Sequence, residues 1–200
     1  MKQWLTPLLV MLAVLALCAC LSQAHPQKNF FALEAAIPEA RADLSRKTLL
    51  VGVVSAAAGY DGRALVYRLG PQRFDTDFYN EFTAPPARLL ADQAAQYLDA
   101  ASRRVRAVKT AGLVTADFGL ETYLEAMHGD FSIEPPQAVL SIRFTVNDLR
   151  RPQAKVLLDK TYRRAAPLAA RTPEALAAAL SGCLSAVLAE LNSDIDKNIR

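Results

Sequence analysis

The hydrophobic and polar positions of residues 138–147 alternate more regularly than those of any other stretch of the chain. Every second residue there is apolar, and the residues between them are mostly polar. The apolar set is Ala138, Leu140, Ile142, Phe144 and Val146. A period of two is typical of a β-strand with one face on a core and the other nearer to water. Residues 150–153 then read as a loop, and residues 156–163 as the partner strand.

Other apolar runs predict further extended segments. They lie at residues 30–33, 48–54, 64–69, 73–78, 105–108 and 120–131. The run 48–54 is apolar at both parities, which is typical of a strand buried on both faces. The breaker Gly70-Pro71 joins two strands closely enough to predict a hairpin. Gly129-Asp130 indicates a bulge or bend in the run 120–131.

Two stretches carry a helical period instead. The first opens at Pro85-Pro86 and ends near Ala101. The second begins with Thr172 as cap, Pro173 at its first position and Glu174 in its first turn. Its apolar stripe is Leu176, Leu180, Cys183, Leu184, Val187, Leu188 and Leu191. These patterns predict one α+β domain over 30–191, a mostly antiparallel sheet with two main helices packed on one side, and a polar tail over 192–200.

The first twenty residues have a different character. Lys2 precedes an uncharged apolar run, 5–19, which is shorter than the roughly 20 residues of a spanning helix and suits a secretory signal. Leu17-Cys18-Ala19-Cys20 resembles the lipobox of bacterial lipoproteins. We therefore predict a lipoprotein signal peptide over 1–19 and lipid modification of Cys20. Cys18 is a poorer acceptor because bulky Leu17 precedes it, and a plain secretory cleavage near Ala24 is the other alternative.

Lipidation makes residues 20–29 a tether between the membrane and the domain. Several acyl chains, such as palmitate, hold a protein stably where one does not. The residues after Cys20 are Leu21 and Ser22, with no Asp. By resemblance to enteric sorting rules this favours the periplasmic face of the outer membrane, with the inner membrane as the alternative.

The net charge and the cysteine content bear on the class of partner and on the state of the thiols. The net charge is +3 and falls to +2 when Lys2 leaves with the signal, so a nucleic-acid partner is not indicated. Loss of Cys18 and acylation of Cys20 leave Cys183 without a disulfide partner. We expect that thiol to be buried in the last helix.

Three sequence segments carry a resemblance to a known family. They are 65–68 (LVYR), 78–82 (FYNEF) and 85–89 (PPARL). In their order and spacing they resemble the ABC-type transport auxiliary lipoproteins, and the resemblance spans most of 20–191. The family's usual Trp before the first helix is replaced by the aromatics of 78–82. The resemblance implies a non-catalytic accessory subunit that works with an MCE-domain protein, a permease and an ATPase to move phospholipids or other hydrophobic compounds between membranes.

Candidate docking residues lie in the same segments. Tyr67 and Arg68 are either part of a partner surface or a core aromatic with its solvated neighbour. Phe78, Tyr79 and Phe82 crowd three aromatics into five residues, so at least one is expected near the surface.

Signals for catalysis, metals and cofactors are weak. The only histidines are His25 and His128, and neither a phosphate-binding loop nor a Gly-x-Ser-x-Gly elbow occurs. His128 lies close to Asp130, but we expect neighbouring strand residues to face apart, and no nucleophile motif accompanies them. We therefore predict no enzyme, cofactor or metal. The remaining classes are a transport accessory subunit and an envelope scaffold or assembly lipoprotein unrelated to transport.

Overall fold

A computed structural model describes residues 27–40, 46–109 and 115–199 of the chain, so the signal, Cys20 and most of the tether lie outside the described residues. The strands in chain order are β1 (Asn29–Phe31), β2 (Lys47–Ala56), β3 (Ala64–Arg68), β4 (Phe74–Phe82), β5 (Val105–Val108), β6 (Phe118–Asp130), β7 (Gln137–Asp148) and β8 (Lys155–Pro167). The helices are α2 (Pro86–Ala101) and α3 (Pro173–Asn198).

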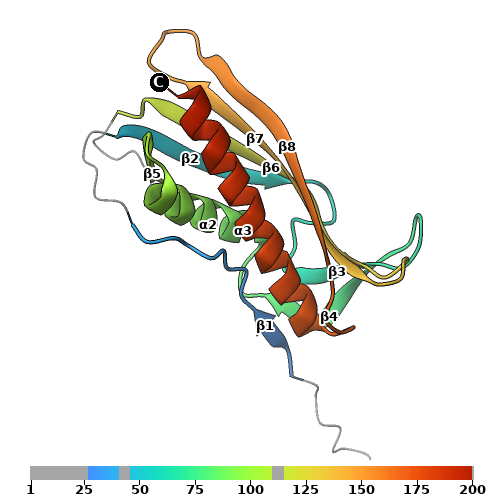
Figure 1. The fold of residues 1–200 in the computed structure, drawn as a ribbon. Helices are drawn as coiled ribbons and strands as arrows, with labels where there is room; N and C mark the ends of the chain where they lie inside the picture. The colour runs from blue at the N-terminus through green and yellow to red at the C-terminus, as the bar shows by residue number, and fades with distance from the viewer. Residues whose placement is uncertain (1–26, 41–45, 110–114, 200) are drawn as a thin grey trace, which may run out of the picture.

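Strand β6 is the centre of the sheet (Figure 1). One of its edges pairs antiparallel with β7 over nearly its whole length, and β7 pairs in the same way with β8. Its other edge is shared by two strands that run parallel to it, β2 as far as Leu124 and β3 at Gly129 and Asp130. Beyond them, β5 lies parallel to β2, while β4 lies antiparallel to β3 and parallel to β1. The α+β prediction is confirmed, with a mixed sheet whose longest pairings are antiparallel.

Both helices lie on the same face of the sheet, as predicted (Figure 1). Helix α3 crosses β7 and β8, and α2 lies over β2 and β5. The Thr172 hydroxyl accepts a hydrogen bond of 3.2 Å from the Ala175 amide, so the predicted cap is confirmed. Every residue of the predicted apolar stripe is buried, Cys183 included. By length and composition alone α3 could cross a membrane, but its stripe packs on the sheet as in a core helix.

The C-terminal segment differs from the expected polar tail, because α3 continues to Asn198. Ile195 is 1% exposed and extends the apolar stripe by one more turn. The polar side chains of this segment are held by residues distant in sequence. Asp194 accepts hydrogen bonds from Tyr162 (2.9 Å) and Lys160 (2.8 Å) on β8, and Asp196 accepts one from the Ser102 hydroxyl (2.7 Å) just after α2. The polar tail predicted for 192–200 is therefore helical as far as Asn198, because these distant partners, rather than local composition, hold it against the domain.

Strand β2 also differs from its prediction. Leu49 and Val51 are buried, but Val53 is 93% exposed. All three residues lie at odd positions, so a regular strand would turn them to the same face of the sheet. The pairing with β6 shifts register between Val51 and Val54, and beyond this shift Val54 is buried while Val53 faces solvent. The expectation that 48–54 is buried on both faces was therefore wrong.

The expected irregularity of β6 lies elsewhere than at Gly129-Asp130. The register shift in β6 falls between Leu124 and Ala126. Gly129 is paired regularly, and a Cβ there would lie 2.6 Å from the Phe131 ring. This glycine therefore makes room for an aromatic side chain.

Candidate functional site

The five residues predicted to dock a partner lie in separate surroundings. Tyr67 is half-buried on β3, where its hydroxyl donates a 2.8 Å hydrogen bond to the Asp77 carboxylate. Its ring meets the edge of Phe131 with centroids 5.4 Å apart. Burial and the hydrogen bond to Asp77 raise the pKa of Tyr67 well above its ordinary value, so the phenol stays neutral. Tyr67 is thus tied into the domain rather than presented freely.

Arg68 is held by a buried carboxylate. Its Nη1 lies 3.2 Å from Oδ2 of Asp130, which is 4% exposed. Burial would raise the pKa of Asp130, but hydrogen bonds from Ser132 and the charge of Arg68 outweigh it, so the pKa lies below its usual range. Arg68 therefore has a structural role in neutralising Asp130.

The aromatic segment before α2 divides between core and surface. Phe82 is 2% exposed and belongs to the core, so the expectation that it docks a partner is corrected: it lies at the end of β4, where the strand pairs with Phe31 of β1. Phe78 is 70% exposed and Tyr79 is 42% exposed. Their rings contact each other edge to face, with centroids 5.0 Å apart.

Sequence reasoning missed three residues that gather around Phe78 and Tyr79. Phe30 on β1 is exposed beside them, because β1 pairs with the end of β4. Lys28 lies over the Phe78 ring and Arg63 over the Phe30 ring. We call Lys28, Phe30, Arg63, Phe78 and Tyr79 the β1–β4 patch. Among the three missed residues only Phe30 had a sequence signal, its adjacency to Phe31, since one of two neighbouring residues must face outward on a strand.

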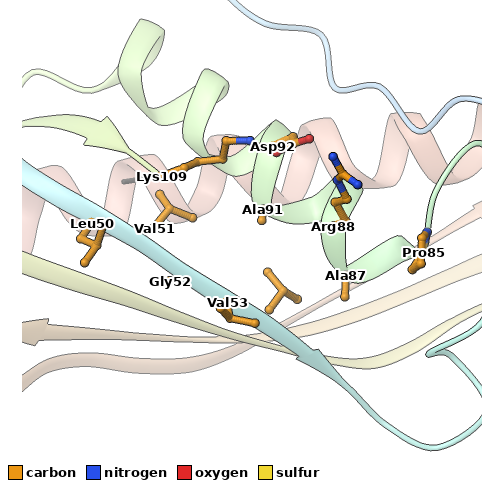
Figure 2. A pocket seen from close by; sticks show the side chains of 11 residues that line it. Leu50, Val51, Gly52, Val53, Pro85, Ala87, Arg88, Ala91, Asp92 and Lys109 are labelled. Carbon is orange, nitrogen blue, oxygen red and sulfur yellow. Dashed lines mark hydrogen bonds and ion pairs between the residues drawn. The ribbon is translucent and has the colours of Figure 1, made fainter. Parts of the chain in front are cut away.

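A groove of about 660 Å³ lies between β2 and the first turns of α2 (Figure 2). Its floor is the apolar middle of β2, and Ala87 and Ala91 point toward it from the helix. Arg88 and the ion pair of Lys109 with Asp92 stand at its rim. None of these residues was predicted as functional, because the groove exists only once α2 folds over the sheet.

The floor of the groove is also an edge of the sheet. Pairing of β2 with β5 ends at Leu50 and Val108. Among the described residues no strand lies on that side of β2 after Leu50, whereas the other side stays paired with β6 as far as Ala56. Unpaired backbone donors and acceptors on such an edge are able to pair with an added strand.

The histidine and aspartate near the end of β6 come closer than we expected. His128 and Asp130 are two positions apart, share a face of the strand and are both buried. His128 Nδ1 lies 3.0 Å from the Tyr60 hydroxyl, and burial lowers the pKa of His128. Within the described ranges, no group of His, Cys, Asp and Glu side chains is placed to hold a metal ion.

The chain is similar to known proteins in its sequence family and in its fold. A family model described as the ABC-type transport auxiliary lipoprotein component matches residues 31–192. A crystal structure of a Xanthomonas campestris protein of the family DUF330 is 18% identical, with a TM-score of 0.69, over 85% of this chain and 96% of that chain. A hypothetical protein from Chlamydia trachomatis is 12% identical, with a TM-score of 0.54, over 77% of this chain and 100% of that chain. Both likenesses concern the fold. No curated protein matches the sequence.

Proposed function

This chain belongs to the ABC-type transport auxiliary lipoprotein component family, and we propose that it is a non-catalytic, lipid-anchored accessory subunit of an MCE-linked ABC system. Such a system moves phospholipids or other hydrophobic compounds across the cell envelope. The observation that carries the proposal is the extent of the family match, which runs from β1 to within the last turns of α3. The match therefore concerns the whole folded domain rather than one motif.

The anchor in this proposal is Cys20, facing the periplasm and more consistent with the outer than the inner membrane. The family match begins at residue 31 and leaves the lipobox ahead of the domain, as an anchor requires. Changing Cys20→Ala should move the protein from the membrane to the soluble periplasmic fraction. Cys18→Ala is the matched control and should leave it membrane-bound with labelled fatty acid attached. A Cys20→Ala protein that still carries the label would contradict the assignment.

We assign the docking of the partner to the groove between β2 and α2. The unpaired edge of β2 favours an extended segment, which adds as a strand through its backbone. The rim carries Arg88 and Lys109, with Asp92 as the opposing charge, so the segment is expected to be neutral or mildly acidic. The proposed occupant is thus an extended segment of the MCE-domain protein.

Capture of partners from the native envelope tests the transport assignment. The lipidated protein should recover an MCE-domain protein together with its permease and ATPase, and a deletion strain should show a weakened lipid barrier. Recovery of no MCE protein, together with a normal barrier, would favour an envelope scaffold unrelated to transport.

A further inference from the structure

The β1–β4 patch gathers exposed aromatic rings where the domain meets its tether. Phe30 is 54% exposed, Phe78 is 70% and Tyr79 is 42%. Beside them, β1 begins at Asn29, whose side chain donates a 3.0 Å hydrogen bond to Asn80 on β4. Large rings exposed side by side are costly in water unless something covers them.

Cations accompany the rings but carry only a small net charge. The Lys28 ammonium lies 4.9 Å from the centroid of Phe78, and the Arg63 guanidinium lies 5.7 Å from that of Phe30. Both cations also pair with Glu81, Arg63 at 2.9 Å. Two cations and one carboxylate leave one positive charge, so the rings rather than the charge dominate the chemistry of this surface.

Aromatic rings bordered by Lys and Arg match the chemistry of the bilayer interface. Tyr favours the headgroup level because its ring is apolar and its hydroxyl is polar, and Phe side chains bury apolar surface at the boundary between headgroups and acyl chains. Lys and Arg beside them extend their charged ends to the phosphates.

The length of the tether limits where the patch can be. Lys28 lies eight positions after Cys20, and an extended chain spans at most about 3.6 Å per residue, so the reach is no more than about 29 Å. The turn between β7 and β8 lies at the opposite end of the sheet (Figure 1). The 12 residues of β7 alone span about 40 Å.

We infer that the β1–β4 patch lies in the headgroup layer of the membrane that holds the Cys20 lipid. The domain then stands on this edge and directs the β7–β8 turn away from the membrane. The inference rests on the lipid anchor of the proposed function, and it adds a fixed orientation to what would otherwise be a domain on a flexible tether.

A single tryptophan placed in the patch tests the inference. The only tryptophan, Trp4, leaves with the predicted signal, so the mature protein has none. The full-length precursor carrying Phe78→Trp is processed in cells, purified in detergent and reconstituted in vesicles of phosphatidylcholine and phosphatidylglycerol. Lipids brominated high on their acyl chains serve as the quencher. We expect a shift of emission to shorter wavelength and a loss of intensity with the brominated lipids.

Val156→Trp is the matched control, because Val156 is 55% exposed at the far end of the sheet. Its emission maximum should stay at the wavelength of a water-exposed indole, and its intensity should not fall with the brominated lipids. If Phe78→Trp stays unquenched while the protein floats with the vesicles, the orientation is wrong and the anchor stands. If the protein does not float with the vesicles, the anchor itself fails, and the inference falls with it.

Discussion

The hydroxyl of Tyr60, in the loop that joins β2 to β3, lies 3.0 Å from the Nδ1 atom of His128 on β6. The Phe74 ring meets the imidazole edge to face, with centroids 5.4 Å apart. His128 is 7% exposed, with the rings of Tyr60 and Phe74 against it. The charged groups that act on the imidazole are Asp130 and Arg68.

This contact predicts that stability depends on pH through His128. Burial lowers the pKa of His128 below its ordinary value of 6.5, Asp130 opposes the shift and Arg68 adds to it. The unfolded chain therefore binds a proton at a higher pH than the folded one, and the free energy of unfolding rises with pH in that window. The contribution to stability should be complete above about pH 6.5 and be lost as the pH falls below this value toward the lowered pKa of the folded protein.

Urea unfolding of the wild type and of His128→Gln at several pH values measures the effect. The variant keeps a group able to hydrogen-bond to Tyr60 but does not titrate, so its stability should vary less between these pH values. If the free energy of unfolding changes equally with pH in the two proteins, His128 is not the titrating group.

The last turns of α3 predict a large effect from Ile195→Ala. Ile195 is 1% exposed, and removing its buried methyl and methylene groups should lower the free energy of unfolding by about 2–5 kcal/mol. The exposed neighbour Ser193 provides the control, since Ser193→Ala should change it by no more than about 0.5 kcal/mol. Similar unfolding midpoints for both variants would contradict the packing of this segment.

The groove predicts a selective loss of partner binding from Ala91→Trp. The indole would fill the space between α2 and β2 that an added strand needs, so affinity for the MCE-domain protein should fall about tenfold or more. Gln96→Trp places the same side chain on the exposed face of α2 and should bind normally. Equal affinities, with thermal unfolding unchanged in both, would locate the interface elsewhere.

The number of reactive thiols per chain tests both the lipid modification of Cys20 and the burial of Cys183. Cys183 is 4% exposed, and burial raises its pKa, with the charge of Arg164 opposing, so little reactive thiolate forms. The mature, lipidated protein should show no fast-reacting thiol when native and one thiol per chain after denaturation. Two thiols after denaturation would mean that Cys20 carries no thioether-linked lipid.

Local periodicity was enough to predict most elements. The alternation at 138–147 and the apolar stripe of α3 involve neighbours within a few positions, so the residues that decide strand or helix are all present in the segment itself. Proline at the first position of α2 and the Thr172 cap of α3 act within one turn, and both helix starts were predicted correctly. The same reasoning failed at 192–198, where the partners of Asp194 come from β8.

The candidate sites depend on contacts that no local pattern encodes. Lys28 and Glu81 are 53 residues apart, and they meet only because β1 pairs with β4. The groove arises because β5 is shorter than β2, so that among the described residues the edge of β2 beyond Leu50 has no strand paired with it. Short-range spacing was sufficient to predict most elements and their order, and it is also the basis of the predicted lipobox. The packing of distant segments sets which face of the sheet is covered, which aromatics reach solvent and which edge of the described strands has no partner, so these features could be found only in the folded domain.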